Sequence, residues 1–127
     1  MVTSRIGETD FRIQHTNGRH EFFADEPADL GGGDTAPSPD ELLEAALASC
    51  TLATLRMYAR HKQWPVGAIE LTVQLSREGG QTRITRELTV EGNLLPEQRE
   101  RLVQVAKACP VSRTLGGASE LTVTINL

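Results

Sequence analysis

Residues 38–50 read SPDELLEAALASC and begin the longest helix that the sequence predicts. Ser38 stands at the N-cap position, Pro39 at the first helical position and Glu41 three residues after the cap, which together form a capping box. An apolar stripe then follows the i, i+3, i+4 spacing of one buried helix face. The members of this stripe are Leu43, Ala46, Leu47, Cys50, Thr54 and Met57. The helix is expected to end shortly before Pro65.

The region before this helix predicts a β-hairpin followed by an irregular loop. Strand-like stretches at residues 10–15 and 19–24 flank Asn17-Gly18, a dipeptide that favours tight hairpin turns. Residues 25–39 contain three prolines and three glycines, which interrupt regular structure. This loop is too short to link two domains.

The region after the helix predicts a second hairpin, a second helix and a last strand. Residues 69–76 and 84–90 alternate apolar and polar side chains on either side of Gly79-Gly80, as half-buried antiparallel strands do. A proline and acidic residues begin a helix expected over residues 96–108. Residues 121–127 alternate again, and we expect them to add a strand to the same sheet.

This order of elements predicts one α+β domain over residues 1–127, with two main helices on one face of an antiparallel sheet. The length of 127 residues and the apolar content of 39% fit a single domain with a modest core. One tryptophan, one tyrosine and three phenylalanines give that core few large side chains. Dimerisation is one way to complete it.

Charge and hydropathy argue against several classes of partner. The formal net charge is −4, and the 13 lysines and arginines are scattered along the chain, so we expect no nucleic acid partner. No apolar run approaches the roughly 20 residues of a membrane-spanning helix, and the N-terminus lacks the pattern of a secretory signal. We therefore expect no membrane partner and a cytoplasmic location, where cysteines are normally kept reduced rather than paired in a permanent disulfide.

The two cysteines, Cys50 and Cys109, lie in settings that suggest a redox pair. Cys50 falls in the middle of the predicted helix, so a donor that activates its thiol must come from elsewhere, and an arginine is the best candidate. Cys109 precedes Pro110 and is a plausible N-cap of a short helical turn, where its thiol would meet unpaired backbone N–H groups. The opposing interpretation is that both are small buried apolar residues, and these features leave that choice open.

Other residue patterns predict no cofactor site. The glycines at residues 31–33 are not followed by the lysine of a phosphate-binding loop. The three histidines lack metal-ligand spacing with one another or with the cysteines, so no zinc site is expected. These histidines are His15, His20 and His61.

Residues 38–50 resemble the reactive-cysteine helix of the OsmC/Ohr family, and residues 109–115, which read CPVSRTL, resemble its second cysteine motif. The loop at residues 25–39 is also similar to members of this family, and the resemblance covers roughly residues 18–127. It implies an OsmC-like α+β fold, an intertwined homodimer with the site at or near the subunit interface, and a thiol peroxidase that acts on organic hydroperoxides.

The resemblance also implies a role for each cysteine. Cys50 would attack the peroxide and become a sulfenic acid, and Cys109 would condense with it to form a disulfide. A dithiol, in this family often a dihydrolipoyl group, would reduce that disulfide by exchange. No metal and no tightly bound cofactor is needed.

The family further uses an arginine and a glutamate to hold the thiolate and align the peroxide. Arg19 stands where the arginine is expected, although Arg12 also belongs to the N-terminal strands. Asp40 lies about 80° around the helix from Cys50, whereas Glu41 lies about 180° away and already serves the capping box. Asp40 is one methylene shorter than the family glutamate and also complements the helix dipole.

Two other functions are compatible with the same fold. A small-molecule binding protein would hold an acyl or lipoyl-like ligand without turnover. A redox sensor would form the disulfide slowly and change a partner surface. The presence of both cysteines in their motifs favours the peroxidase.

Overall fold

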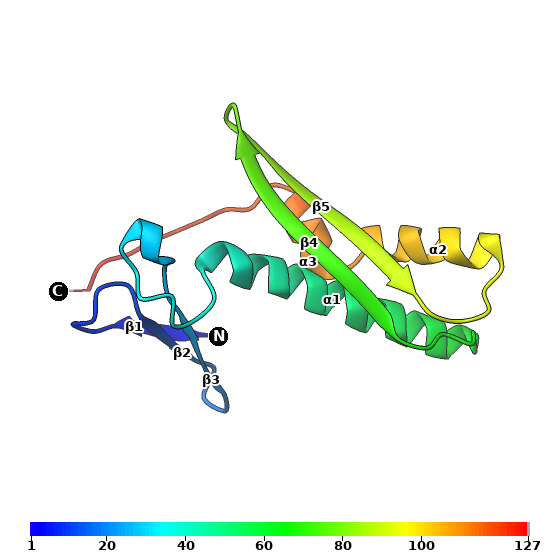
Figure 1. The fold of residues 1–127 in the computed structure, drawn as a ribbon, viewed down its shortest axis with the longest axis horizontal. Helices are drawn as coiled ribbons and strands as arrows, with labels where there is room; N and C mark the ends of the chain where they lie inside the picture. The colour runs from blue at the N-terminus through cyan, green and yellow to red at the C-terminus, as the bar shows by residue number, and fades with distance from the viewer. Residues whose placement is uncertain (127) are drawn as a thin grey trace. The chain divides into compact units, whose positions relative to one another are not determined.

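A computed structural model describes residues 1–126 of this protein, and Leu127 lies outside them (Figure 1). The chain divides into two compact units, Met1–Ala45 and Ala46–Leu127. Helix α1, Pro39–Lys62, begins in the first unit and continues into the second. The single domain predicted from the sequence remains a prediction.

The first unit contains a three-stranded antiparallel sheet in the order β1-β2-β3. Its strands are β1 (Thr3–Ile6), β2 (Ile13–Thr16) and β3 (Glu21–Ala24). The predicted turn is confirmed, since the Asn17 side-chain oxygen accepts hydrogen bonds from the N–H groups of Arg19 and His20, at 2.9 and 2.8 Å. Gly18 takes a φ of +90°, which favours glycine. Strand β1 was not predicted, because all four of its residues are exposed and show no alternation of burial.

The predicted start of α1 is confirmed by its capping box. The Glu41 N–H donates to Ser38 Oγ at 3.3 Å, and the Ser38 N–H donates to Glu41 Oε1 at 3.0 Å. Hydrogen bonds from the Ser38 backbone and the Ser38 side chain to the Glu41 carboxylate lower the pKa of Glu41, the backbone bond more than the side-chain bond. Before the helix, residues 25–38 include a short 3-10 helix, η1 (Ala28–Leu30). Gly32 lies against the Glu26 carbonyl with no room for a Cβ, so this loop follows a tight path.

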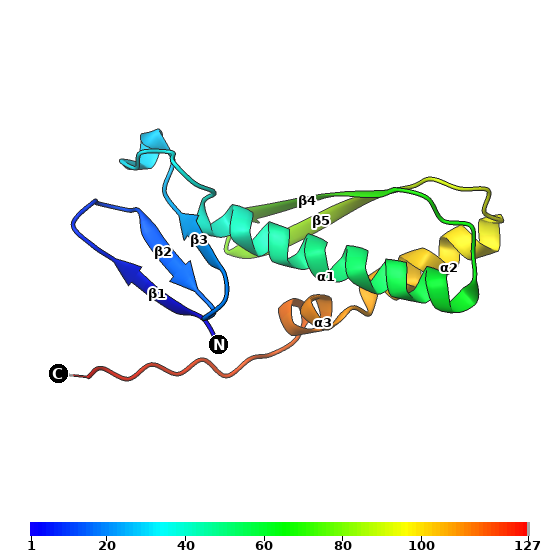
Figure 2. The same cartoon turned by 90° about the horizontal axis from the view of Figure 1, so that it is seen from below.

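The second unit contains the long hairpin of β4 (Ile69–Glu78) and β5 (Gln81–Val90), paired from Ile69↔Val90 to Glu78↔Gln81. Gly79 and Gly80 form the turn, both with positive φ. Two helices follow, α2 (Pro96–Lys107) and α3 (Pro110–Gly116). Figure 2 shows the hairpin nearly edge-on, with α2, α3 and the second-unit part of α1 on one side of it. The α+β class with antiparallel strands and helices on one face is thereby confirmed, with the strands divided between two sheets.

The buried face of α1 differs from the predicted stripe. The buried positions recur every four residues, at Leu47, Thr51, Leu55 and Ala59. Ala46 and Met57 of the predicted stripe are exposed, and Met57 is 69% exposed. The predicted stripe left out Thr51 because Thr51 is polar, although it occupies a core position of the helix. Cys50 borders the buried face and is half-buried.

The predicted last strand is absent from the described chain. Residues 118–126 form neither helix nor strand, and Leu127 of that prediction lies outside the described residues. The apolar positions of the alternation are almost fully exposed, with Leu121 at 92%, Val123 at 94% and Ile125 at 81%. A strand needs a neighbour to accept its backbone hydrogen bonds, and none of the described strands pairs with this segment.

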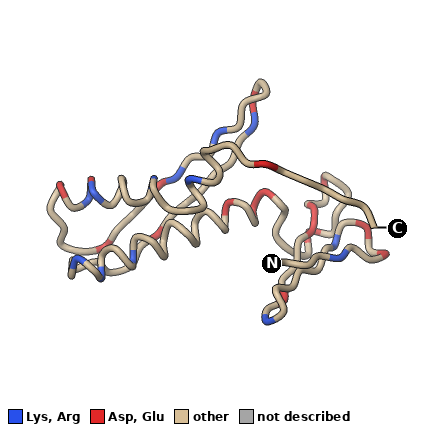
Figure 3. Tube along the Cα trace, turned by 180° about the vertical axis from the view of Figure 1, so that it is seen from behind, with Lys and Arg blue, Asp and Glu red and all other residues tan. Residues whose placement is uncertain are grey.

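Charged residues are distributed as the sequence predicted. Figure 3 shows basic and acidic side chains interspersed within each unit rather than gathered in a block of one sign. Within residues 1–126, no helix has the combination of length and apolar character needed to cross a membrane.

Candidate active site

The second unit brings the two cysteines together, although 59 positions separate them. Cys50 is carried by α1, and Cys109 is the N-cap residue of α3, as predicted. The backbone N–H of Val111, in the first turn of α3, donates to Cys50 Sγ at 3.5 Å. A hydrogen bond between the two thiols also lowers the pKa of Cys109. Both thiols are free, and the arrangement places a nucleophile and a possible disulfide partner side by side.

Cys109 is fully buried and surrounded by donors. Burial raises the pKa of its thiol, and this is the largest single effect. Hydrogen bonding to the Thr51 hydroxyl, the Ser112 backbone and Cys50, together with the positive charge of Arg86, outweighs burial and brings the net pKa below its ordinary value. The Thr51 hydroxyl lies 3.5 Å from Cys109 Sγ. The environment therefore favours a thiolate at a site closed to solvent.

Arg86 is the cation of this site, and the sequence analysis missed it. It extends from β5 and donates to Thr51 Oγ1 at 3.3 Å, the Ala106 carbonyl at 3.1 Å and Ser112 Oγ at 3.1 Å. A signal was present, because Arg86 occupies the position between Ile84 and Leu88 on the face where the alternation places apolar side chains. A charged residue at an inward position of a strand indicates a buried partner.

Two pockets adjoin Arg86 in the second unit. The larger, about 370 Å³, has Thr51, Arg86 and Lys107 as its polar lining residues. Its remaining walls are Leu71, Ile84, Leu88, Val103 and Ala106. The smaller, about 280 Å³, lies beside Ser112 and Leu115. The larger pocket has the apolar walls and few polar groups that are typical of small-molecule sites.

The predicted arginine and carboxylate belong to the first unit, so their part in the site remains a prediction. Arg19 is exposed in the β2–β3 turn, and Asp40 is half-buried in the first turn of α1. Arg12 is engaged elsewhere in that unit, since it donates to Thr35 Oγ1 at 2.7 Å and lies 4.4 Å from the centre of the Phe23 ring. Glu41 is occupied by the capping box.

Asp25 is a buried carboxylate in the first unit that the sequence analysis did not single out. Thr35 donates to its Oδ2 from both its hydroxyl, at 2.6 Å, and its backbone N–H, at 3.1 Å. The N–H groups of Glu26 and Gly33 donate to its Oδ1, at 2.8 and 3.4 Å. Led by the Thr35 hydroxyl, these bonds lower the pKa of Asp25 to about 2. The role of Asp25 is therefore structural, because all these bonds hold the loop before α1.

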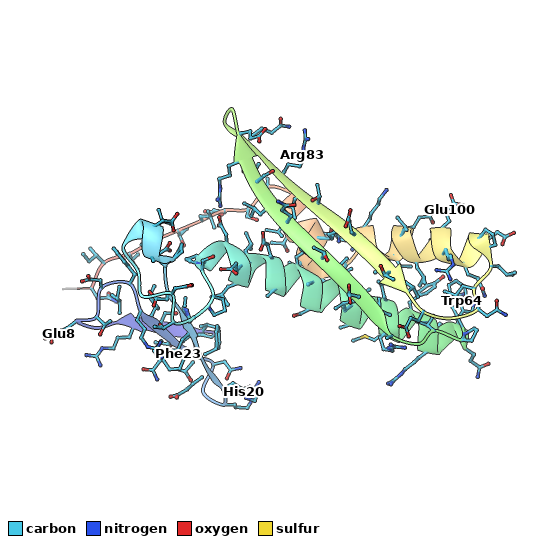
Figure 4. All side chains as sticks on the ribbon, in the orientation of Figure 1. Glu8, His20, Phe23, Trp64, Arg83 and Glu100 are labelled. Carbon is cyan, nitrogen blue, oxygen red and sulfur yellow. The ribbon has the colours of Figure 1, made fainter. Side chains whose placement is uncertain are left out.

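A metal centre finds no support in the described part of the chain, where no three His, Cys, Asp or Glu residues cluster in a way that could hold an ion. Side chains across the described residues are drawn in Figure 4, where Arg83 marks the hairpin and Trp64 the end of α1.

Comparison with known proteins finds one matching family. A profile of the family described as OsmC-like protein matches residues 31–125. No protein with a curated description matches the chain.

Solved structures share the fold over most of the chain. The organic hydroperoxide resistance protein OhrB of Bacillus subtilis is 28% identical, with 92% of this chain and 90% of that chain covered and a TM-score of 0.63. A candidate osmotic stress induced and detoxification response protein from Psychrobacter arcticus is 25% identical, with 90% and 88% covered and a TM-score of 0.75. An OsmC-like protein from Mycoplasma pneumoniae is 24% identical, with 99% and 93% covered and a TM-score of 0.73. The family profile matches most of the chain, and the two cysteine motifs and the α+β architecture agree with it. The chain therefore belongs to the OsmC-like protein family.

Proposed function

We propose that this protein is a thiol-dependent peroxidase that reduces organic hydroperoxides. The observation that carries the proposal is the meeting of Cys50 and Cys109, with the Val111 N–H directed at Cys50 Sγ. A backbone donor stabilises developing negative charge on sulfur, which a nucleophilic thiol requires. Cys50 is the more accessible of the two, so it is the thiol that meets the peroxide.

The proposed cycle has three steps. The Cys50 thiolate attacks the terminal oxygen of the hydroperoxide, the O–O bond breaks, and the alkoxide takes a proton and leaves as an alcohol. The Cys109 thiolate then attacks the sulfenic sulfur of Cys50, the S–S bond forms, and hydroxide leaves and is protonated to water. An external dithiol, such as a dihydrolipoyl group, reduces the disulfide by exchange and is itself oxidised.

Arg19 and Asp40 are proposed to complete the first step. Arg19 would hold the Cys50 thiolate and the peroxide, and Asp40 would hold the guanidinium in place. Arg12 is the weaker candidate because its guanidinium already contacts Thr35 and Phe23. Asp40 is preferred over Glu41 because the Glu41 carboxylate accepts the Ser38 N–H.

An organic substrate is proposed because the pocket beside Thr51 has apolar walls. Its volume of about 370 Å³ accommodates an alkyl or aryl group. Hydrogen peroxide carries no such group and would leave the pocket unused. The name of the Bacillus subtilis relative as an organic hydroperoxide resistance protein supports the same class. We further propose that the protein is a homodimer and acts in the cytoplasm, where reducing dithiols are available.

The same pocket also favours a second candidate, a protein that binds a small acyl or lipoyl-like molecule without turnover. Lys107 and Arg86 at a largely apolar pocket suit a ligand with an apolar body and an anionic end. This candidate predicts binding without consumption of peroxide.

Intact mass after peroxide treatment tests the proposal. One equivalent of cumene hydroperoxide is added to the reduced wild type, to Cys109→Ser and to Cys50→Ser under non-reducing conditions. The wild type should lose two hydrogens, Cys109→Ser should gain one oxygen at Cys50, and Cys50→Ser should be unchanged over the same time. If the wild-type mass stays the same with both cumene hydroperoxide and hydrogen peroxide, the peroxidase proposal fails.

A further inference from the structure

Arg86 is a charged residue on an apolar strand face, and its hydrogen-bond partners are all neutral. It is half-buried on β5 and contacts one group from each of three helices, Thr51 on α1, Ala106 on α2 and Ser112 on α3. Removing a guanidinium from water is costly unless a negative charge forms nearby. None of its hydrogen-bond partners in the described residues supplies one. The group able to supply it is the thiol of Cys109, because Thr51 contacts both residues.

The Thr51 hydroxyl joins these two groups and has a single proton to give. It lies 2.8 Å from the Leu47 carbonyl, 3.5 Å from Cys109 Sγ and 3.3 Å from Arg86 Nη1. With Cys109 as a thiol, Thr51 donates to Leu47 and accepts from both Cys109 and Arg86. With Cys109 as a thiolate, the hydroxyl must turn and donate to sulfur. Leu47 tolerates this change because its carbonyl keeps the backbone bond of the helix.

We propose that Arg86, acting through the Thr51 hydroxyl, is a positioning residue that holds Cys109 ready as the thiolate that closes the disulfide on Cys50. Arg86 keeps a donor on Thr51 Oγ1, which polarises the hydroxyl and leaves its proton for the sulfur. Its second amino group fixes Ser112 in the first turn of α3, the helix that Cys109 caps. This role rests on the proposed function and concerns its second step, which the cysteine motifs alone do not explain.

The charges around Cys109 agree with this role. The ionisable groups that act on the thiol are Arg86 from β5 and Cys50 from α1, and both lower its pKa. Burial raises that pKa more than any single donor lowers it, so the balance depends on the donors together. Removing Arg86 withdraws the charge directly and also releases the Thr51 hydroxyl.

The test compares Arg86→Gln, Arg86→Lys and the matched control Arg83→Gln. Arg83 lies three residues earlier on β5, exposed on the opposite face of the strand (Figure 4). Rapid-quench mass spectrometry follows the sulfenic acid and the disulfide separately after addition of cumene hydroperoxide. Arg86→Gln removes a positive charge that lowers the pKa of Cys109, so a smaller fraction of this thiol is ionised and disulfide closure should slow about tenfold near neutral pH.

The pH profile distinguishes this role from a structural one. In Arg86→Gln the midpoint of the closure rate should move to higher pH, and a dimedone adduct of Cys50 should accumulate. Arg86→Lys should restore part of the rate, and Arg83→Gln should match the wild type. If closure in Arg86→Gln proceeds at the wild-type rate with an unchanged pH midpoint, the role assigned to Arg86 is wrong.

A second measurement keeps the inference separate from the peroxidase proposal. In Cys50→Ser the remaining thiolate absorbs near 240 nm, and its titration should shift to higher pH when Arg86→Gln or Thr51→Val is added. Thr51→Ser, which keeps the hydroxyl, should not shift it. If the titration shifts but the protein does not react with peroxide, the proposed function is overturned and the positioning role of Arg86 stands. If the protein reacts with peroxide but the titration does not shift, only the positioning role of Arg86 is overturned.

Discussion

Asp25 shows how one residue can organise a loop, and its low pKa makes a prediction about stability. The pKa of about 2 lies below the ordinary value of 3.8, so the folded chain binds the Asp25 proton less readily than the unfolded chain. Its stabilising contribution is therefore complete above pH 3.8 and is lost as the pH falls toward 2. Asp25→Asn should lower the melting temperature at pH 7 and lose most of that deficit near pH 2.

Thermal unfolding followed by circular dichroism from pH 2 to pH 7 checks this prediction. Asp29→Asn, an exposed carboxylate of the same loop, is the matched control and should behave as the wild type. A deficit in Asp25→Asn that is equally large at both ends of the pH range would contradict the assigned role.

Asp25 and Arg86 share the reason for which sequence reasoning overlooked them. Each belongs to a network built around a threonine hydroxyl. The Thr35 hydroxyl connects Arg12 to Asp25, and the Thr51 hydroxyl connects Arg86 to Cys109. Such networks join residues that are far apart in the sequence, and neither threonine belongs to a recognisable motif. The break in the β5 alternation at Arg86 was the one local sign.

At the scale of elements, the exposed segment at residues 118–126 carries the alternation of a strand but pairs with none of the described strands. Strands β1 and β3 are the edges of a three-stranded sheet, and β4 and β5 each have one unpaired edge. We expect this segment to pair with such an edge in a second copy of the chain and to bury Leu121, Val123 and Ile125 there. This arrangement would give the homodimer that we propose.

Substitution within the alternation tests this pairing. Val123→Lys places a charge on the apolar side and should weaken a dimer by roughly tenfold or more, about 1.4 kcal/mol. Thr124→Lys, on the polar side, should leave association nearly unchanged. Light scattering after size exclusion measures both variants, and a wild type that stays monomeric at high concentration would refute the prediction.

For the whole molecule, local chemistry determined what could be predicted. The Ser38 capping box, the Asn17-Gly18 turn and the Gly79-Gly80 turn depend on neighbouring residues, and all three are where the sequence placed them. The meeting of Cys50 with Cys109 followed from resemblance to a family rather than from spacing. The buried face of α1 and the fate of the last segment depend on contacts between distant parts, which periodicity alone does not specify.

The position of the cysteines on α1 and before α3 has one more consequence. Joining Cys50 to Cys109 would close residues 50–109, which hold the β4–β5 hairpin and α2, into a covalent ring. By the chain-entropy argument, a ring of this size reduces the conformational entropy of the unfolded state and so stabilises the folded state by up to about 4 kcal/mol. The oxidised protein should melt about 10 °C or more above the reduced one. Calorimetry with and without a dithiol would then read the redox state as heat resistance, and equal melting temperatures would show that no ring had formed.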